Sequence, residues 1–182
     1  MTINGGTFNS QECGAMAFNG ATLTINGGTF NTVDNFAIGT NGSAGRGNNT
    51  VIINKAVINA NIISNGYEAC GIYIPNNDRV TIGPDVEINV INGCGILMRA
   101  GEVIVKKGVK INISTNKEDG FSGWVGDNKT KMKQSGIIYH ESANYPAKTG
   151  MKLTVENGVS INAVDENIEI LSNEENPQVI IL

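Results

Sequence analysis

The chain has 182 residues, 40% of them apolar, which is enough for one domain with its own hydrophobic core. Its net charge of −4 comes from acidic and basic residues spread along the sequence, which argues against a nucleic-acid partner. No stretch approaches the roughly 18 consecutive apolar residues of a membrane-spanning helix, so we expect no membrane partner either.

Short alternating segments recur along the chain and predict a first kind of strand. Apolar side chains at every second position of a strand point to one side of the sheet. The side chains assigned in this way to the interior are Ile3, Leu23, Ile25, Val51, Ile53, Val80, Ile82, Val103, Val105, Leu153 and Val155. The residues between them, such as Thr24, Thr81 and Thr154, would point outward.

A second kind of segment follows each first strand and ends on an asparagine. The six asparagines are Asn9, Asn31, Asn59, Asn89, Asn112 and Asn162. They recur roughly every 20 to 30 residues, apart from one longer last step, and a period of this size is typical of a solenoid. We expect their side-chain amides to stack as a ladder, with the backbone in the left-handed conformation that asparagine tolerates at a bend.

A third apolar segment follows each asparagine, at residues 16–18, 36–38, 72–74, 96–98, 137–139 and 168–170. Three strands in each repeat predict an all-β fold, a right-handed parallel β-helix solenoid of about six coils. We expect this β-helix to form a single domain over residues 1–182. Departures from the shortest repeat predict long loops at 39–50, 115–135 and 141–152.

Residues 2–9 and 24–31 have the same sequence, TINGGTFN, which resembles the repeats of pectate-lyase-like β-helix proteins of bacterial surfaces and phage virions. The resemblance covers nearly the whole chain at the level of the fold. It implies an extracellular location, on a bacterial cell surface or a phage virion. Proteins of this kind include polysaccharide lyases, hydrolases, phage tailspikes with depolymerase activity, and coils that only bind or space, so the fold leaves the function open.

The predicted coils begin and end without a cap. Met1 leads directly into the first strand, and residues 179–182 have the sequence of a further strand. An uncapped solenoid exposes strand edges and its apolar interior. We therefore expect either that the sequence is a piece of a longer protein or that partners cover its ends.

Aromatic residues in the two long loops of the fifth repeat are candidates for ligand binding. Trp124 and Tyr145 offer flat apolar faces of the kind that stack on sugar rings, which predicts a polysaccharide ligand. The alternative is that both side chains anchor the loops to the coil.

An apolar stripe is predicted on the outer side of the third strands. Tyr73, Leu97 and Ile138 take equivalent outward positions in three consecutive repeats. Such a stripe needs a cover, which is either a long loop or another subunit, as in a homotrimer or a contact with a neighbouring virion or surface subunit.

Possible catalytic residues lie one position beyond this stripe. Arg99 and His140 occupy equivalent places in adjacent repeats, with Glu141 beside them. A lyase base removes the proton next to a uronate carboxylate while a cation stabilises the enolate, and these residues, with Tyr73, would suit that chemistry. The alternative is a structural role for His140 and Arg99.

The catalytic motifs of the resembling enzymes are not found in this sequence. It has neither the Asn-Thr-Asp and Asp-Asp groups of polygalacturonases nor the acidic calcium cluster and Arg-x-x-Pro-x-x-Arg of pectate lyases. Our main hypothesis is therefore a non-catalytic structural and binding module for a glycan or a neighbouring subunit. The alternative is a polysaccharide lyase or glycoside hydrolase with a groove near the fifth coil.

The three cysteines and the single histidine predict neither a metal site nor a cofactor. Cys70 and Cys94 each stand two residues before an inward isoleucine, so we expect them to stack inside adjacent coils as small apolar residues. A disulfide or a metal bound by this pair is the alternative. The third cysteine is Cys13, and the chain has no His/Cys spacing typical of zinc.

Overall fold

A computed structural model describes residues 1–43, 45–64, 68–117, 131–140, 151–172 and 177–182. Within these ranges the chain forms seventeen strands and no helix. All strand pairs are parallel and lie in two sheets of eleven and six strands, an arrangement consistent with a β-helix solenoid. Because no helix is present in these ranges, none of them can supply a helical membrane span.

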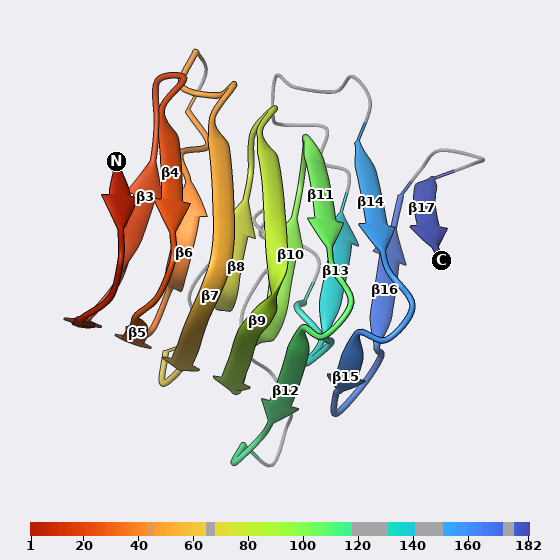
Figure 1. Cartoon of the computed structure of the whole chain (residues 1–182). Coiled ribbons are helices and arrows are strands. Elements are labelled where there is room, and N and C mark those ends of the chain that lie inside the picture. The colour runs from red at the N-terminus through yellow and green to blue at the C-terminus, as the bar shows by residue number, and fades with distance from the viewer. Residues whose placement is uncertain (44, 65–67, 118–130, 141–150, 173–176) are drawn as a thin grey trace.

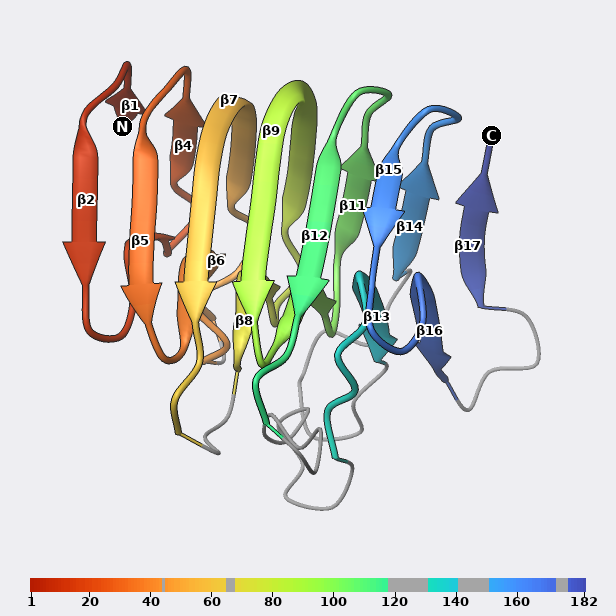
Figure 2. The same ribbon diagram turned by 90° about the horizontal axis from the view of Figure 1, so that it is seen from below.

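The larger sheet contains two rows of strands. Its first row is β1 (Thr2–Ile3), β4 (Thr22–Ile25), β7 (Thr50–Asn61), β9 (Arg79–Ile91), β11 (Glu102–Val105), β14 (Lys152–Val155) and β17 (Gln178–Ile181). Its second row is β2 (Thr7–Ser10), β5 (Thr29–Val33), the later halves of β7 and β9, β12 (Lys110–Ser114) and β15 (Ser160–Asn162). Figure 2 shows both rows side by side along the stack.

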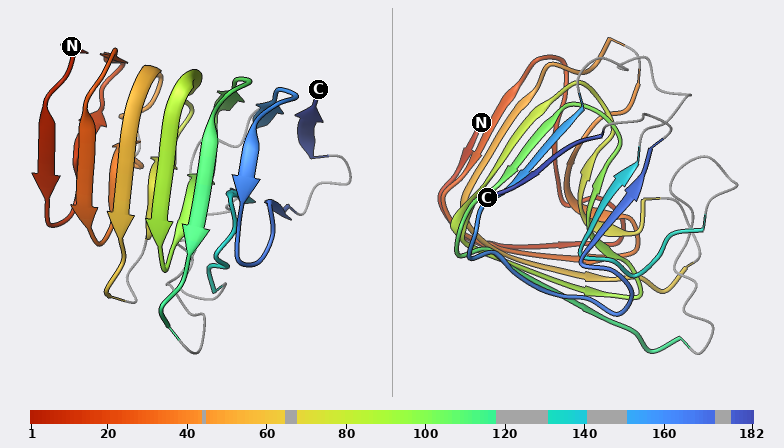
Figure 3. Two further views of the ribbon diagram at one scale, coloured as in Figure 1. Left: turned by 60° about the horizontal axis from the view of Figure 1, so that its bottom comes forward. Right: turned by 90° about the vertical axis from the view of Figure 1, so that its right-hand side faces the viewer.

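The smaller sheet is the third row. It runs in the order β3 (Ala15–Ala17), β6 (Phe36–Thr40), β8 (Cys70–Ile74), β10 (Cys94–Met98), β13 (Ile137–His140) and β16 (Ile168–Leu171). Viewed along the stack in the right-hand part of Figure 3, successive repeats nearly superimpose around a common interior.

The predicted alternation of the first strands agrees with the burial of their side chains. The predicted inward residues from Leu23 to Val155 are at most 4% exposed, and Ile3 is partly buried against the same core. Thr24, Thr81 and Thr154, between them, are all only partly buried. The inward isoleucines of the third row, such as Ile72 and Ile96, complete one continuous core.

The division of every repeat into separate first and second strands is wrong for β7 and β9. Each of these two strands runs without a break through the corner that the sequence predicted. An irregularity in their pairing between Ile53 and Lys55 accommodates the bend. Other repeats turn this corner at glycines with positive φ, Gly28 at 125° and Gly108 at 95°.

The six predicted asparagines lie in register within the second row, and amide hydrogen bonds join five of them. The Nδ2 atoms of Asn31, Asn59, Asn89 and Asn112 donate to the Oδ1 atoms of Asn9, Asn31, Asn59 and Asn89 at 2.8, 2.8, 3.1 and 2.9 Å. Asn162 is the register partner of Asn112. Each of these bonds links one repeat to the next.

The expected left-handed backbone at these asparagines is wrong. They lie inside strands, where the extended backbone already places the amides one above another, so no bend is needed for stacking. The residues with positive φ are elsewhere in the described chain: Asn19, Asp34, Asn35, Asn48, Glu68 and Asn92, together with seven glycines.

Glycines at the start of the third strands allow the rows to close on the core. A Cβ atom at Gly71 would lie 2.7 Å from Cγ2 of Ile88, and one at Gly95 would lie 2.5 Å from Cγ2 of Ile111. The interior at this corner is therefore filled by isoleucines of the asparagine-bearing strands. A side chain at either glycine would overpack it.

Candidate functional site

A pocket of about 300 Å³ opens at the smaller sheet, beside β3, β6 and β8. The turn after β6 forms one wall, and the segment that leads into β8 forms the opposite wall. The lining residues are Met16, Phe36, Thr40, Asn41, Gly42, Ser43, Glu68 and Tyr73.

The register of the third row brings these residues together. Gly39 of β6 pairs with Met16 of β3 on one side and with Tyr73 of β8 on the other. A Cβ atom at Gly39 would lie 2.6 Å from Cε2 of Phe36, so the glycine leaves room for that ring. The rings of Phe36 and Tyr73 then pack with their centroids 5.3 Å apart.

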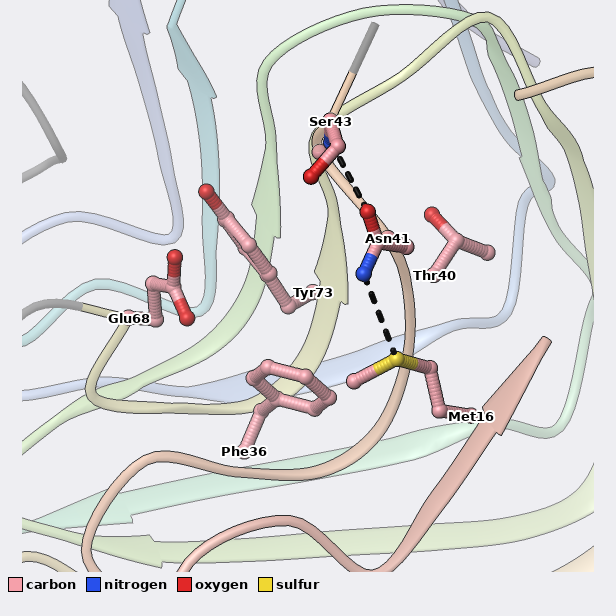
Figure 4. Close-up of a pocket in the computed structure, with 8 residues that line it drawn as sticks. Met16, Phe36, Thr40, Asn41, Ser43, Glu68 and Tyr73 are labelled. Carbon is pink, nitrogen blue, oxygen red and sulfur yellow. Dashed lines mark hydrogen bonds between the residues drawn. The ribbon is translucent and has the colours of Figure 1, made fainter. Parts of the chain in front are cut away.

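Three polar side chains meet beside the aromatic pair. Nη1 of Arg99 donates to the hydroxyl of Tyr73 at 3.4 Å, and this hydroxyl is in turn hydrogen-bonded to the Glu68 carboxyl group. Arg99 is only 2% exposed, so its charge lies behind Tyr73 and not in the open pocket. Figure 4 shows Glu68 beside Tyr73, across the pocket from Asn41 and Ser43.

The environment of Glu68 makes its carboxyl group harder to ionise than that of a free glutamate. Burial raises the pKa of its carboxyl group, while the hydrogen bond from Tyr73 and the charge of Arg99 act in the opposite direction and only partly offset that rise. Its backbone has a φ of 65°, a conformation that costs more for glutamate than for glycine or asparagine. A perturbed carboxyl group in a pocket is a mark of a functional site.

Of the residues predicted for lyase chemistry, Tyr73 lines this pocket, whereas Arg99 and His140 do not. Met98 pairs with Tyr139, which brings the following residues, Arg99 just after β10 and His140 at the end of β13, to neighbouring places. His140 is 7% exposed, and Arg99 is still more deeply buried. Within the part of the chain that the structure describes, neither side chain lines the pocket beside β3, β6 and β8. Glu141, the predicted acid beside them, lies outside the described residues.

The predicted apolar stripe is aligned as expected but is not open. Leu97 pairs with Tyr73 and with Ile138, so the three residues do follow one another across β8, β10 and β13. Their exposed fractions are 2% or less. The three side chains are therefore buried in the folded chain. Trp124 and Tyr145 lie outside the described residues.

Cys70 and Cys94 pair across β8 and β10, fully buried and as free thiols. Burial raises the pKa of the Cys70 thiol well above its usual value, and the neighbouring Cys94 thiol adds to this rise. Within the ranges that the structure describes, no three His, Cys, Asp or Glu side chains are grouped so that they could hold a metal ion.

Sequence reasoning missed the pocket because its members come from four separated segments. Glu68 stands before β8 in no recognisable motif, and the sequence gives no sign that its backbone is left-handed. One usable signal was Gly39, which stands where the neighbouring repeats have Met16 and Tyr73. A missing side chain in an outward row creates space beside its neighbours.

Comparison with known proteins adds no assignment to this site. No family model matches the chain, and searches of curated proteins and of solved structures found no match. The function is therefore argued from the geometry.

Proposed function

We propose that this chain is a non-catalytic module of a right-handed parallel β-helix, with about six coils and an asparagine ladder, similar to the pectate-lyase-like type. It serves as a rigid spacer and binding platform for a glycan, in a phage virion or bacterial surface protein. The observation that carries this proposal is the row of amide hydrogen bonds, which follows the parallel pairing from Asn9 to Asn112.

Rigidity is the property that such a row supports. The three inner amides, Asn31, Asn59 and Asn89, are bonded to the repeats on both sides, so one of these repeats cannot tilt without breaking side-chain bonds as well as the backbone pairing. A second row, from Asn54 to Asn26 and from Asn26 to Asn4, adds bonds of 2.8 and 2.9 Å at the first corner. A stiff stack of this kind suits a spacer that holds a binding surface at a fixed place.

Binding is supported by the pocket beside Glu68 and Tyr73, which combines an aromatic wall with hydroxyl, amide and carboxyl groups. This mixture of apolar surface and a few polar groups is typical of small-ligand sites. A neighbouring subunit of a virion or surface assembly, or a second copy of this chain, is the alternative partner.

The contacts of Glu68 also favour a second candidate, a polysaccharide lyase or glycoside hydrolase. A carboxyl group with a raised pKa is suited to donate a proton, and Arg99 beside Tyr73 could stabilise negative charge. Against hydrolysis, Glu68 is the only acidic residue among the described residues that line the pocket, whereas most glycoside hydrolases use two carboxyl groups.

Binding and turnover measured on the same ligands test this proposal. The protein would be applied to immobilised bacterial surface polysaccharides, and the same polysaccharides would be assayed in solution for new reducing ends and for unsaturated uronate products. We expect binding without either product. Formation of a product would favour the enzyme, and absence of binding to every glycan would remove the glycan platform.

A further inference from the structure

We propose that the pocket beside β3, β6 and β8 binds one neutral hexose unit of a glycan through the Glu68 carboxyl group and the Tyr73 hydroxyl. This inference rests on the glycan-binding function proposed above and adds its site and ligand class. The pocket volume of about 300 Å³ is at the lower limit for small-ligand sites, which suits one sugar ring and not a longer chain segment.

The walls of the pocket offer hydrogen bonds of both kinds. The Glu68 carboxylate has two acceptor oxygens, which match two neighbouring sugar hydroxyls. On the facing wall, Nδ2 of Asn41 donates to the sulfur of Met16 at 4.0 Å, its one acceptor among the described residues, and sulfur is a weak acceptor. This N–H group can therefore turn to a sugar oxygen with little loss.

The charges around the pocket favour a neutral ligand. Glu68 repels a uronate, and Arg99 is too deeply buried to pair with one directly. The guanidinium group of Arg99 offsets part of the negative charge of Glu68, which weakens the attraction for an amine. Sugar hydroxyl groups carry no charge, so they can donate hydrogen bonds to the carboxylate oxygens without the repulsion that a uronate meets and without needing the full negative charge that an amine needs.

The backbone conformation of Glu68 supports a ligand site independently of the pocket lining and the charges. All other described residues with positive φ are glycine, asparagine or aspartate, the residue types that adopt this conformation most readily. Glutamate has no such preference, and glycine would relieve the strain at this position. Residues held in strained backbone conformations cluster at ligand sites, because there the side chain is retained for binding and not for stability.

Calorimetric titration with single sugars tests this inference. The probes are glucose, galactose, mannose and N-acetylglucosamine, with glucuronate and glucosamine as charged comparisons. We expect at least one neutral sugar to bind more tightly than both charged ones. Replacing Glu68→Gln should weaken binding by about tenfold or more, because a hydrogen bond to a charged group is lost. Glu87→Gln, the same change on the outer side of β9, should leave the affinity unchanged.

A second pair of variants separates binding from folding. Glu68→Gly should abolish binding while leaving the unfolding temperature equal or higher, since it removes the strained side chain. Ser43→Tyr adds a ring at the exposed rim and should block the pocket without removing a buried group. Loss of binding in both variants, with intact unfolding transitions, supports the site.

Three results would overturn the inference, and the first two differ from failure of the proposed function itself. Sugar binding that survives in Glu68→Gln and Ser43→Tyr places the glycan site elsewhere and leaves the proposed function standing. Tighter binding of glucuronate or glucosamine contradicts the ligand class. If the wild type binds neither these sugars nor any immobilised polysaccharide, the glycan function and this site fall together.

Discussion

The asparagine-bearing side of the molecule and the pocket side differ in how fully their polar side chains are hydrogen-bonded. On the former, amides such as Asn59 and Asn89 hydrogen-bond to equivalent amides one repeat away, so each repeat satisfies the next. At the pocket, Glu68 has a strained backbone, and its carboxyl group is only partly compensated by Tyr73 and Arg99. The contrast indicates that the regular side is built for stability and the irregular side for binding.

The largest expected effect comes from breaking the core that both sides share. A side chain at Gly95 would meet Cγ2 of Ile111 and the carbonyl oxygen of Gly136, each at 2.5 Å. We expect Gly95→Val to reduce the free energy of unfolding by about 3 kcal/mol or more. Urea unfolding followed by circular dichroism measures this loss.

Gly5→Ala is the matched control for that change, because a Cβ atom at Gly5 would have no neighbour within 4 Å. We expect it to change stability by no more than about 0.5 kcal/mol. Similar losses of stability for Gly5→Ala and Gly95→Val would contradict the close packing described at the start of the third-row strands.

Removing an amide from the regular side should have the next largest effect. Asn89 donates to Asn59 and to Glu87 and accepts from Asn112, so Asn89→Ala removes three bonds. We expect a loss of about 1 to 2 kcal/mol in the free energy of unfolding, since the amides are only partly buried.

Asn9→Ala serves as the comparison for that variant, because Asn9 is exposed and accepts one amide bond, from Asn31. We expect a loss of about 0.5 kcal/mol. Thermal unfolding of both variants measures the two losses of stability. Equal losses at Asn9 and Asn89 would show that the amide bonds do not hold the repeats together.

A smaller effect is expected at the pocket side, where the contribution of Glu68 to stability should depend on pH. The folded pKa of Glu68 lies above its usual value of 4.5, so the folded state binds this proton more tightly than the unfolded state. The resulting stabilisation is complete below the usual value and is lost as pH rises through the raised pKa. The stability of the wild type relative to Glu68→Gln should therefore fall with rising pH over this range. A difference that is constant, or that grows with pH, would rule out the buried carboxyl group.

The smallest effect is expected at the exposed charges of the first row. Glu102 contacts Arg79 at 3.6 Å and Lys152 at 3.7 Å, on neighbouring strands. Glu102→Gln should reduce stability by less than about 1 kcal/mol, because both cations are exposed and screened. Unfolding at low and high salt checks this, and a large loss that is insensitive to salt would contradict it.

Repetition explains which parts of the fold could be predicted. The inward positions, such as Leu23 and Val51, and the in-register asparagines repeat several times, so one pattern supports all copies. The corner of β7 and β9 could not be predicted in this way, because their sequences at the bend differ from those of the first two repeats. The second amide row, from Asn4 to Asn54, was missed because it spans only the first three repeats.

The pocket could not be predicted because it depends on features that occur only once in the sequence. Gly39 interrupts an outward row that Met16 and Tyr73 otherwise fill, and Glu68 adopts a backbone conformation that its residue type disfavours. Neither feature has a repeat to support it. The predicted enzyme residues Arg99 and His140 were correctly placed at equivalent positions of adjacent repeats, but alternation alone could not show that both are buried.

Mapping bound sugar onto the backbone tests the division between the two sides most directly. Neutral hexoses would be titrated into isotope-labelled protein while amide chemical shifts are recorded. We predict shifts confined to the amides of Met16, Phe36, residues 40–43, Glu68 and Tyr73. Shifts along the strands that carry Asn31, Asn59 and Asn89, with none at the pocket, would contradict the account.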